Sequence, residues 1–131
     1  LDGQLAVADL PGAWNEKFQQ LLGLTVESDA MGCLQDIQWS FGGMGYFPTY
    51  TLGNLYAAQF MEAARRDLPG LEDGFRQGDF ARLKSWLNEK IHQPGLRWRA
   101  ADLCRHVTGK PLDHAPLMRY LRDKYTPLYG L

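Results

Sequence analysis

The feature that most constrains the fold is an uncharged stretch of 25 residues, positions 37–61. A membrane-spanning helix needs about 20 consecutive, mostly apolar residues, and glycines, a proline and hydroxyl side chains interrupt this stretch. An ordinary surface segment, in turn, would carry charge. We therefore interpret the region as a glycine-rich loop over residues 31–47 followed by a buried helix over residues 49–67. Such a segment is typical of a domain core and equally of one wall of a binding cleft.

The remainder of the chain is predicted to be helical. Apolar residues recur at spacings of three and four, which is typical of helices with one buried face. The helix over residues 49–67 is apolar or small on every side in its first half, so we expect that half to be buried and the charged half from Glu62 to reach solvent. Alternation typical of strands is missing. We predict an all-α fold, an irregular array of five to six helices with a glycine-rich loop, as a single helical unit over residues 1–131.

Proline, glycine and aspartate mark the ends of the other predicted helices. These helices span residues 13–22, 71–76, 80–92 and 100–108, with Asp79 as the N-cap of the helix over 80–92 and Asp113 as the cap of a last helix. The side chains expected to face inward are Trp14, Phe18, Leu21 and Leu22 in the first helix, Phe80, Leu83, Leu87 and Ile91 in the helix over 80–92, Leu103, Cys104 and Val107 in the next, and Leu117, Tyr120, Leu121 and Leu128 in the last.

Charge and cysteine content exclude several classes of function. The formal net charge is −1, and a chain without a basic face lacks the feature by which proteins bind nucleic acid. Cys33 and Cys104 lie in apolar sequence, so we interpret them as small buried side chains in a reducing compartment. No signal peptide is visible, and we expect a cytoplasmic location without membrane association. The missing initial methionine suggests a processed or truncated piece of a longer protein.

The patterns expected of metal and nucleophile chemistry are missing from the sequence. Catalytic zinc usually has three protein ligands, but His92, His106 and His114 are not paired at helical spacing and no H-E-x-x-H motif occurs. We therefore predict no metal site in this chain and interpret the histidines as surface or helix-end residues. Neither cysteine has a basic partner in a recognisable motif. The glycines around Gly43 lack the lysine of a phosphate-binding loop.

A polar cluster inside the apolar segment is the remaining candidate site. Buried polar groups are destabilising unless they are hydrogen-bonded, so the carboxylate of Asp36, which apolar residues flank, needs a partner. Two readings stay open: Asp36 caps a helix or holds a backbone amide, or it orients a catalytic histidine or a substrate group. The cluster consists of Gln35, Asp36, Gln38, Tyr46 and Tyr50.

Residues 32–39 read Gly-Cys-Leu-Gln-Asp-Ile-Gln-Trp. This run resembles the late motif G-x-x-Q-D-x-H-W of the carboxypeptidase Taq family of zinc metallocarboxypeptidases, the thermostable carboxypeptidases. Residues 45–59 and shorter motifs at residues 9–17, 107–112 and 120–125 are also similar to that family. The resemblance covers essentially all 131 residues in order, as a C-terminal segment of such an enzyme.

The resemblance implies an all-helical peptidase that removes single residues from peptide C-termini, commonly as a homodimer. In such enzymes a zinc ion activates water, a glutamate of H-E-x-x-H acts as general base, and arginines hold the substrate carboxylate. Those parts are expected upstream, so the chain alone is expected to be inactive and to bind no metal. Its implied contribution is a wall of the substrate groove, where a tyrosine hydroxyl would stabilise a developing oxyanion. The residues expected to form that wall are Gln35, Asp36, Gln38, Tyr46 and Tyr50.

One position departs from the family motif, because its histidine is Gln38 here. Glutamine donates and accepts hydrogen bonds but neither carries charge nor moves a proton near neutral pH. The role left to Gln38 is therefore to shape the cleft. Together with the missing zinc motif, this substitution motivates an alternative hypothesis, a non-catalytic helical interaction module derived from the same scaffold.

If the predicted long helix packs against helices outside this chain, apolar surface is exposed around Trp39, Phe41, Phe47 and Phe60. Large exposed apolar patches drive association, so we expect the isolated chain to self-associate or rearrange at high concentration. Light scattering over a concentration series measures this directly, and a monomer throughout the series would contradict it.

Overall fold

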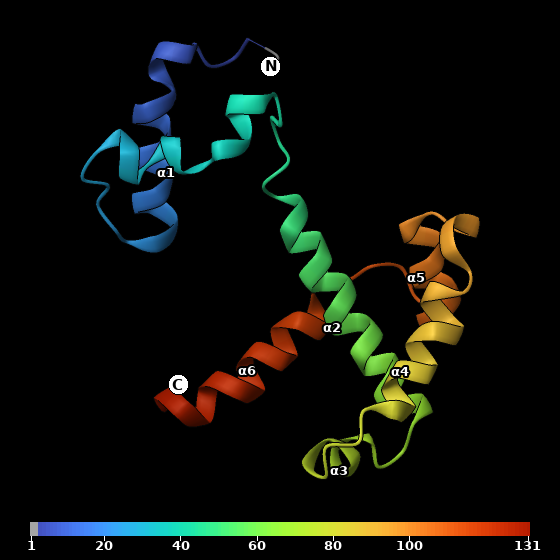
Figure 1. Cartoon of the computed structure of the whole chain (residues 1–131). Helices are drawn as coiled ribbons and strands as arrows, with labels where there is room; N and C mark the ends of the chain where they lie inside the picture. Colours follow the sequence, from blue (N-terminus) through green and yellow to red (C-terminus); the bar gives the residue numbers. More distant parts are fainter. Residues whose placement is uncertain (1–2) are drawn as a thin grey trace. The chain divides into compact units, whose positions relative to one another are not determined.

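The computed structural model describes residues 3–131, and this part of the chain consists of helices, short turns and loops without any strand. The predicted all-α fold is therefore confirmed. By their internal contacts the residues divide into a first unit that ends at Pro48 and a second unit, Thr49–Leu131. The expectation of a single helical unit stays a prediction. The α-helices, labelled in Figure 1, are α1 (Leu10–Leu22), α2 (Thr49–Asp67), α3 (Leu71–Arg76), α4 (Ala81–Leu87), α5 (Ala100–Thr108) and α6 (Ala115–Tyr129).

The first unit packs a series of short turns against α1. The helix begins three residues earlier than predicted, with Pro11 in its first turn, where the missing N–H leaves no hydrogen bond unmade. Trp14 of α1 meets Trp39 edge-to-face, with ring centroids 6.2 Å apart. The expected inward stripe of α1 is wrong at its end, since Leu21 and Leu22 are exposed. No other element of the described first unit covers that last turn.

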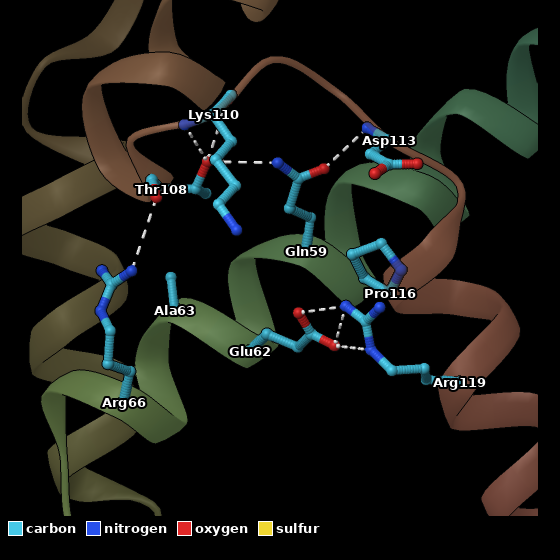
Figure 2. A pocket seen from close by; sticks show the side chains of 9 residues that line it. All are labelled: Gln59, Glu62, Ala63, Arg66, Thr108, Lys110, Asp113, Pro116 and Arg119. Carbon is cyan, nitrogen blue, oxygen red and sulfur yellow. Dashed lines mark hydrogen bonds and ion pairs between the residues drawn. The ribbon is translucent and has the colours of Figure 1, made fainter.

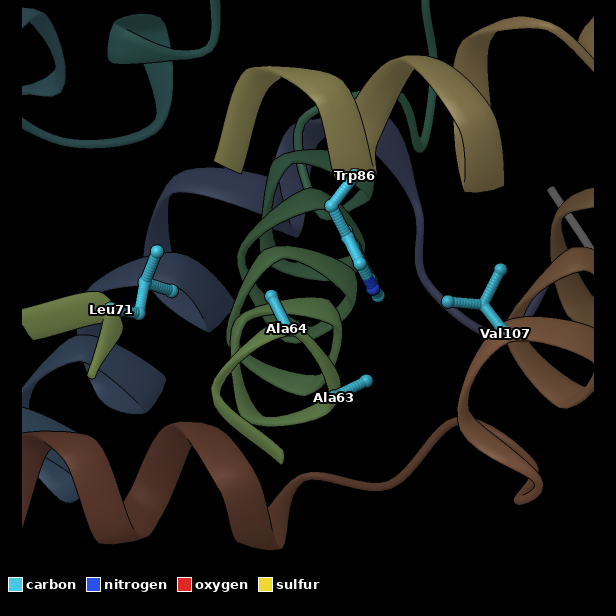
Figure 3. Packing of buried hydrophobic residues seen from close by; sticks show 5 residues of the cluster. All are labelled: Ala63, Ala64, Leu71, Trp86 and Val107. Atoms are coloured by element: carbon cyan, nitrogen blue, oxygen red, sulfur yellow. The ribbon is translucent and has the colours of Figure 1, made fainter. Parts of the chain in front are cut away.

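The second unit has a small hydrophobic core that four helices share (Figure 3). Ala63 and Ala64 of α2 are almost fully buried, and their small side chains allow neighbouring elements to approach the helix closely. Trp86 of α4 fills most of the space next to them and is 5% exposed, and its indole N–H donates to Asp67 Oδ2 at 3.0 Å. The core cluster consists of Ala63, Ala64, Leu71, Trp86 and Val107.

The long helix has the predicted bounds, and Arg65, Arg66 and Asp67 at its end are exposed as expected, but its first half is not the buried part. Its fully buried residues lie in the second half, at Gln59, Ala63 and Ala64, whereas Tyr50 and Leu52 of the first half are 55% and 47% exposed. The expectation of a buried first half is therefore wrong for this chain. The reason is that α3, α4 and α5 form the core with the second half of α2, while its first turns contribute no residue to that core.

Helix ends follow the capping residues that the sequence predicts. Asp79 and Asp113 accept hydrogen bonds from the amides of Ala81 and Ala115 at 2.9 and 3.0 Å, which satisfies donors that have no partner inside a helix. The predicted helix over residues 80–92 is α4 followed by one π-helical turn, Asn88–His92. At its start Phe80 is 58% exposed rather than buried, and its ring stacks on that of Phe75.

Burial elsewhere largely matches the expected stripes. Cys104 and Val107 of α5 are buried, and both cysteines are free thiols inside the protein. In α6, Leu117 and Leu121 are partly buried, but Tyr120 and Leu128 are exposed, contrary to expectation. Across residues 3–131, no helix is both long and apolar enough to cross a membrane.

From the composition of the core we predict that two aromatic substitutions near α4 differ strongly in their effect on the free energy of unfolding. Trp86→Ala removes a buried ring and its hydrogen bond, so we expect the free energy of unfolding to fall by about 3–5 kcal/mol. Phe80→Ala removes an exposed ring and is expected to cost at most about 1 kcal/mol. Urea denaturation followed by circular dichroism measures both, and equal losses would contradict the assignment of the core.

Candidate functional site

The segment that carries most of the predicted groove residues is held against the first unit by close packing at Gly32. A Cβ atom at this position would lie 2.7 Å from Val26 Cγ1 and 3.3 Å from Asn15 Oδ1. Cβ atoms essentially never lie this close to another carbon atom, so any other residue at this position would require Val26 or the backbone of residue 32 to shift. Cys33 next to it is buried. The start of this segment therefore packs closely against the rest of the first unit.

Asp36 caps the short turn that follows. Its Oδ1 accepts a hydrogen bond from the amide of Gln38 at 3.2 Å, at the start of the 3-10 turn Ile37–Phe41. This geometry matches the structural reading of Asp36, in which the carboxylate holds a backbone amide. The hydrogen bond to Gln38 involves one of the two carboxylate oxygens. The alternative interpretation, in which Asp36 orients a catalytic or substrate group, stays a prediction.

The other predicted groove residues have distinct surroundings. Gln35 is exposed and its side-chain amide donates to the carbonyl of Ala30. Gln38 is half-buried, and Tyr46 is exposed in the loop that follows the turn. Tyr50 is exposed in the first turn of α2, which belongs to the second unit. The structure thus brings Gln35, Asp36 and Gln38 together on consecutive turns, and the groove wall as a whole stays a prediction.

A second polar site, which sequence reasoning missed, lies on α2 (Figure 2). Gln59 is 5% exposed. Its Nε2 donates to Thr108 Oγ1 at 3.2 Å and to the Pro111 carbonyl at 2.9 Å, and its Oε1 accepts from the Asp113 amide at 2.9 Å. The signal was present in the sequence, because a glutamine inside the uncharged stretch needs partners once it is buried.

Thr108 completes this network at the end of α5. Its hydroxyl donates to the Cys104 carbonyl at 2.8 Å and accepts from the Lys110 amide at 3.2 Å. Gly109 between them adopts the left-handed conformation, with φ of 77°, which a side chain would disfavour. The predicted helix end at Gly109 is confirmed, and it turns the chain toward Gln59.

A cavity of about 250 Å³ lies beside the network, between α2, the end of α5, the connector (residues 109–114) and α6. Across it, Arg119 holds both oxygens of Glu62 at 2.8–3.0 Å. Both side chains are roughly half exposed, so this ion pair contributes at most about 1 kcal/mol to stability. Arg66 and Lys110 also line the cavity.

Several ionisable groups near the cavity are shifted by their neighbours. The amide of Ala115, with His114 beside it, holds the pKa of Asp113 below its ordinary value. Hydrogen bonds from Arg66 and Trp86 lower the pKa of Asp67 in the same way. Burial raises the pKa of the Cys104 thiol, and a thiol that stays protonated is a poor nucleophile. Cys104 is therefore a packing residue.

The described residues do not offer a metal centre. Among positions 3–131, no group of three or more histidine, cysteine, aspartate or glutamate side chains is arranged to hold an ion. His92, His106 and His114 are exposed, as expected of surface residues, and His106 stacks on Trp98 at 5.3 Å.

The helical fold and the motif at residues 32–39 together are typical of one class of protein. Comparison of the sequence with known protein families identifies that class. The model of the carboxypeptidase Taq (M32) metallopeptidase family matches residues 1–125, and the chain belongs to this family. It is 43% identical over 128 residues to carboxypeptidase 1 of Bacillus subtilis and 44% identical over 128 residues to thermostable carboxypeptidase 1 of Thermus thermophilus. Each alignment covers 98% of this chain but 26% and 25% of those proteins.

Solved structures give the same result. The M32 carboxypeptidase of Deinococcus radiodurans is 46% identical with a TM-score of 0.93, over 98% of this chain and 26% of that one. Trypanosoma cruzi metallocarboxypeptidase 1 is 42% identical with a TM-score of 0.87, over 95% of this chain and 26% of that one. The chain thus spans about a quarter of the length of its relatives.

The network around Gln59 predicts a loss of stability when its side-chain amide is removed. Gln59→Leu keeps the volume but leaves the Asp113 amide and the Pro111 carbonyl without partners. Each unsatisfied buried group costs about 1–3 kcal/mol, so we expect a total loss of about 2–6 kcal/mol in urea denaturation and faster hydrogen exchange at the Asp113 amide. Gln93→Leu, at an exposed position, is the matched control; equal effects of the two variants would refute the structural role.

Proposed function

We propose that this chain acts as part of a longer metallocarboxypeptidase that removes single residues from peptide C-termini. The observation that carries the proposal is the family match over residues 1–125, which includes the run Gly-Cys-Leu-Gln-Asp-Ile-Gln-Trp at residues 32–39. Zinc is the proposed metal, with ligands outside the described residues. Its chemistry would be activation of the attacking water. The proposed location is cytoplasmic.

Within that enzyme, the proposed task of this segment is to form one wall of the substrate groove. Support comes from the fixed position of the turn that carries Gln35, Asp36 and Gln38, which Gly32 and the contact of Trp14 with Trp39 hold against α1. Binding groups placed on a rigid scaffold lose little entropy when substrate binds. Tyr46 and Tyr50 are exposed aromatic residues with a hydroxyl group, which suits contact with a peptide.

Because residue 38 is a glutamine, the proposed groove wall does not offer a proton-transfer group at this position. The backbone amide of Gln38 donates to Asp36, so the turn conformation depends on the carboxylate rather than on the side chain of Gln38. The amide side chain offers one donor group and one acceptor without a proton that transfers near neutral pH. The proposed role of Gln38 is therefore to orient substrate by hydrogen bonds.

A non-catalytic interaction module remains the second candidate function. The glutamine at residue 38 and the lack of a metal-binding group among residues 3–131 favour it. Under either function, homodimer formation or self-association is the proposed assembly, because Phe41 and Phe47 expose large apolar surfaces. Nucleic acid and membranes are not proposed partners, given the net charge of −1.

The two functions differ in the activity of the longer protein. We expect the longer protein with zinc to release single C-terminal residues from peptides and to lose this activity with a metal chelator, whereas the 131-residue chain releases none with added zinc. Ninhydrin or mass-spectrometric detection of released amino acids measures both. An inactive longer protein would favour the interaction module, and turnover by the short chain would refute the assignment of the catalytic parts to other residues.

The same assay tests the groove wall. Asp36→Ala in the longer protein removes the cap of the turn, so we expect kcat/KM to fall at least about tenfold, a loss of about 1.4 kcal/mol in transition-state binding. Ser40→Ala, at an exposed position of the same turn, is the control and is expected to stay within about twofold of the parent. Unchanged kcat/KM in the Asp36 variant would argue against the proposed wall.

A further inference from the structure

The cavity on α2 has features that neither the late motif nor the proposed peptidase chemistry uses. Its lining brings together three cations from different elements: Arg66 of α2, Lys110 of the connector and Arg119 of α6. Figure 2 shows the side chain of Lys110 pointing into the space between Gln59, Ala63 and Arg66. Glu62 pairs with Arg119 and Asp67 pairs with Arg66, so among the described residues Lys110 is the one of these three cations without a paired carboxylate.

The carboxylates at the cavity are largely occupied. Both oxygens of Glu62 accept from Arg119. Asp113 Oδ1 accepts from the Ala115 amide and lies 3.2 Å from His114 Nδ1. The acidic side chains that line the cavity therefore already have hydrogen-bond donors from the chain itself.

The three cationic side chains at the cavity, in contrast, still have N–H groups that donate no hydrogen bond. Arg66 uses Nε for Asp67 at 2.9 Å and Nη1 for the Thr108 carbonyl at 3.5 Å, which leaves Nη2. Arg119 uses Nε and Nη2, which leaves Nη1. Lys110 is the one cavity cation without a carboxylate within 4.0 Å among residues 3–131. The cavity therefore has more spare donors than acceptors.

We propose that this cavity binds a small oxyanion, a phosphate or a carboxylate, with the Lys110 ammonium as the principal contact and the spare guanidinium N–H groups of Arg66 and Arg119 beside it. Charged donors form strong hydrogen bonds to such oxygens, and arginine presents them in a fixed planar arrangement. The volume of about 250 Å³ lies below the range of about 300–1,000 Å³ typical of drug-sized ligands. It suits an ion of a few heavy atoms.

The proposed ion would connect the three elements that meet at the cavity. Lys110 follows directly on the Thr108 and Gln59 network, so its backbone is already held in place. Only the side-chain ends of the three cations need to be ordered when the ion binds, and ordering few side chains costs little entropy. Binding is expected to stabilise the packing of α6 and the connector on α2.

The test is binding of inorganic phosphate and of succinate to the 131-residue chain at constant ionic strength set with NaCl. We expect one of the two to bind with a dissociation constant on the order of 1 mM and, at ten times that concentration, to raise the thermal midpoint by about 4 °C. Which of the two ions binds tells a phosphate site from a carboxylate site. Isothermal calorimetry supplies the stoichiometry, expected to be one ion per chain.

Two lysine variants separate this site from general salt effects, which stabilise many proteins. Lys110→Met keeps the backbone contacts of the connector and is expected to raise the dissociation constant at least about tenfold. Lys84→Met removes the same charge from an exposed position of α4 and is expected to bind like the parent. If neither ion binds, or if both variants bind alike, the proposal is overturned.

Discussion

The side chain of Gln59 is the contact on which the packing of the second unit depends. Its three hydrogen bonds join α2 to residues that lie 49, 52 and 54 positions further along the chain. Closing a loop of that length costs conformational entropy, which the core between α2, α4 and α5 offsets in part. Because Gln59 then holds the connector, α6 begins beside α2, and Arg119 comes within reach of Glu62.

The magnitudes of the contacts decide which of them matter for stability. The ion pairs of the second unit involve exposed side chains, and each contributes about 0–1 kcal/mol. Leaving one partner of Gln59 unsatisfied costs about 1–3 kcal/mol, and a buried tryptophan accounts for about 3–5 kcal/mol. The fold of this unit thus depends on Trp86 and Gln59, while the charges around the cavity are available for other roles.

In the first unit, close packing rather than a hydrogen-bond network holds the segments together. Gly32 allows the chain to pass within van der Waals distance of Val26 and Asn15, and Trp39 packs on Trp14. The turn that Asp36 caps is therefore positioned by packing and not by its own hydrogen bond alone. Packing of this kind favours one conformation of the turn, as the proposed substrate-binding wall would require.

The sequence by itself determined the local structure and the family. The bounds of α2, α3 and α5 and the capping roles of Asp79 and Asp113 were predictable, since proline, glycine and aspartate act on their own neighbours. The motif at residues 32–39 indicated the carboxypeptidase Taq family, which the family model confirms.

Only the tertiary structure decided which surfaces are buried. Composition predicted a buried first half of α2, yet the second half forms the core, because burial depends on which elements come to lie against a helix and not on its own residues. Trp86 and Gln59 were missed for the same reason. The cavity with Arg66, Lys110 and Arg119 likewise arises from positions far apart in sequence, which no local pattern brings together.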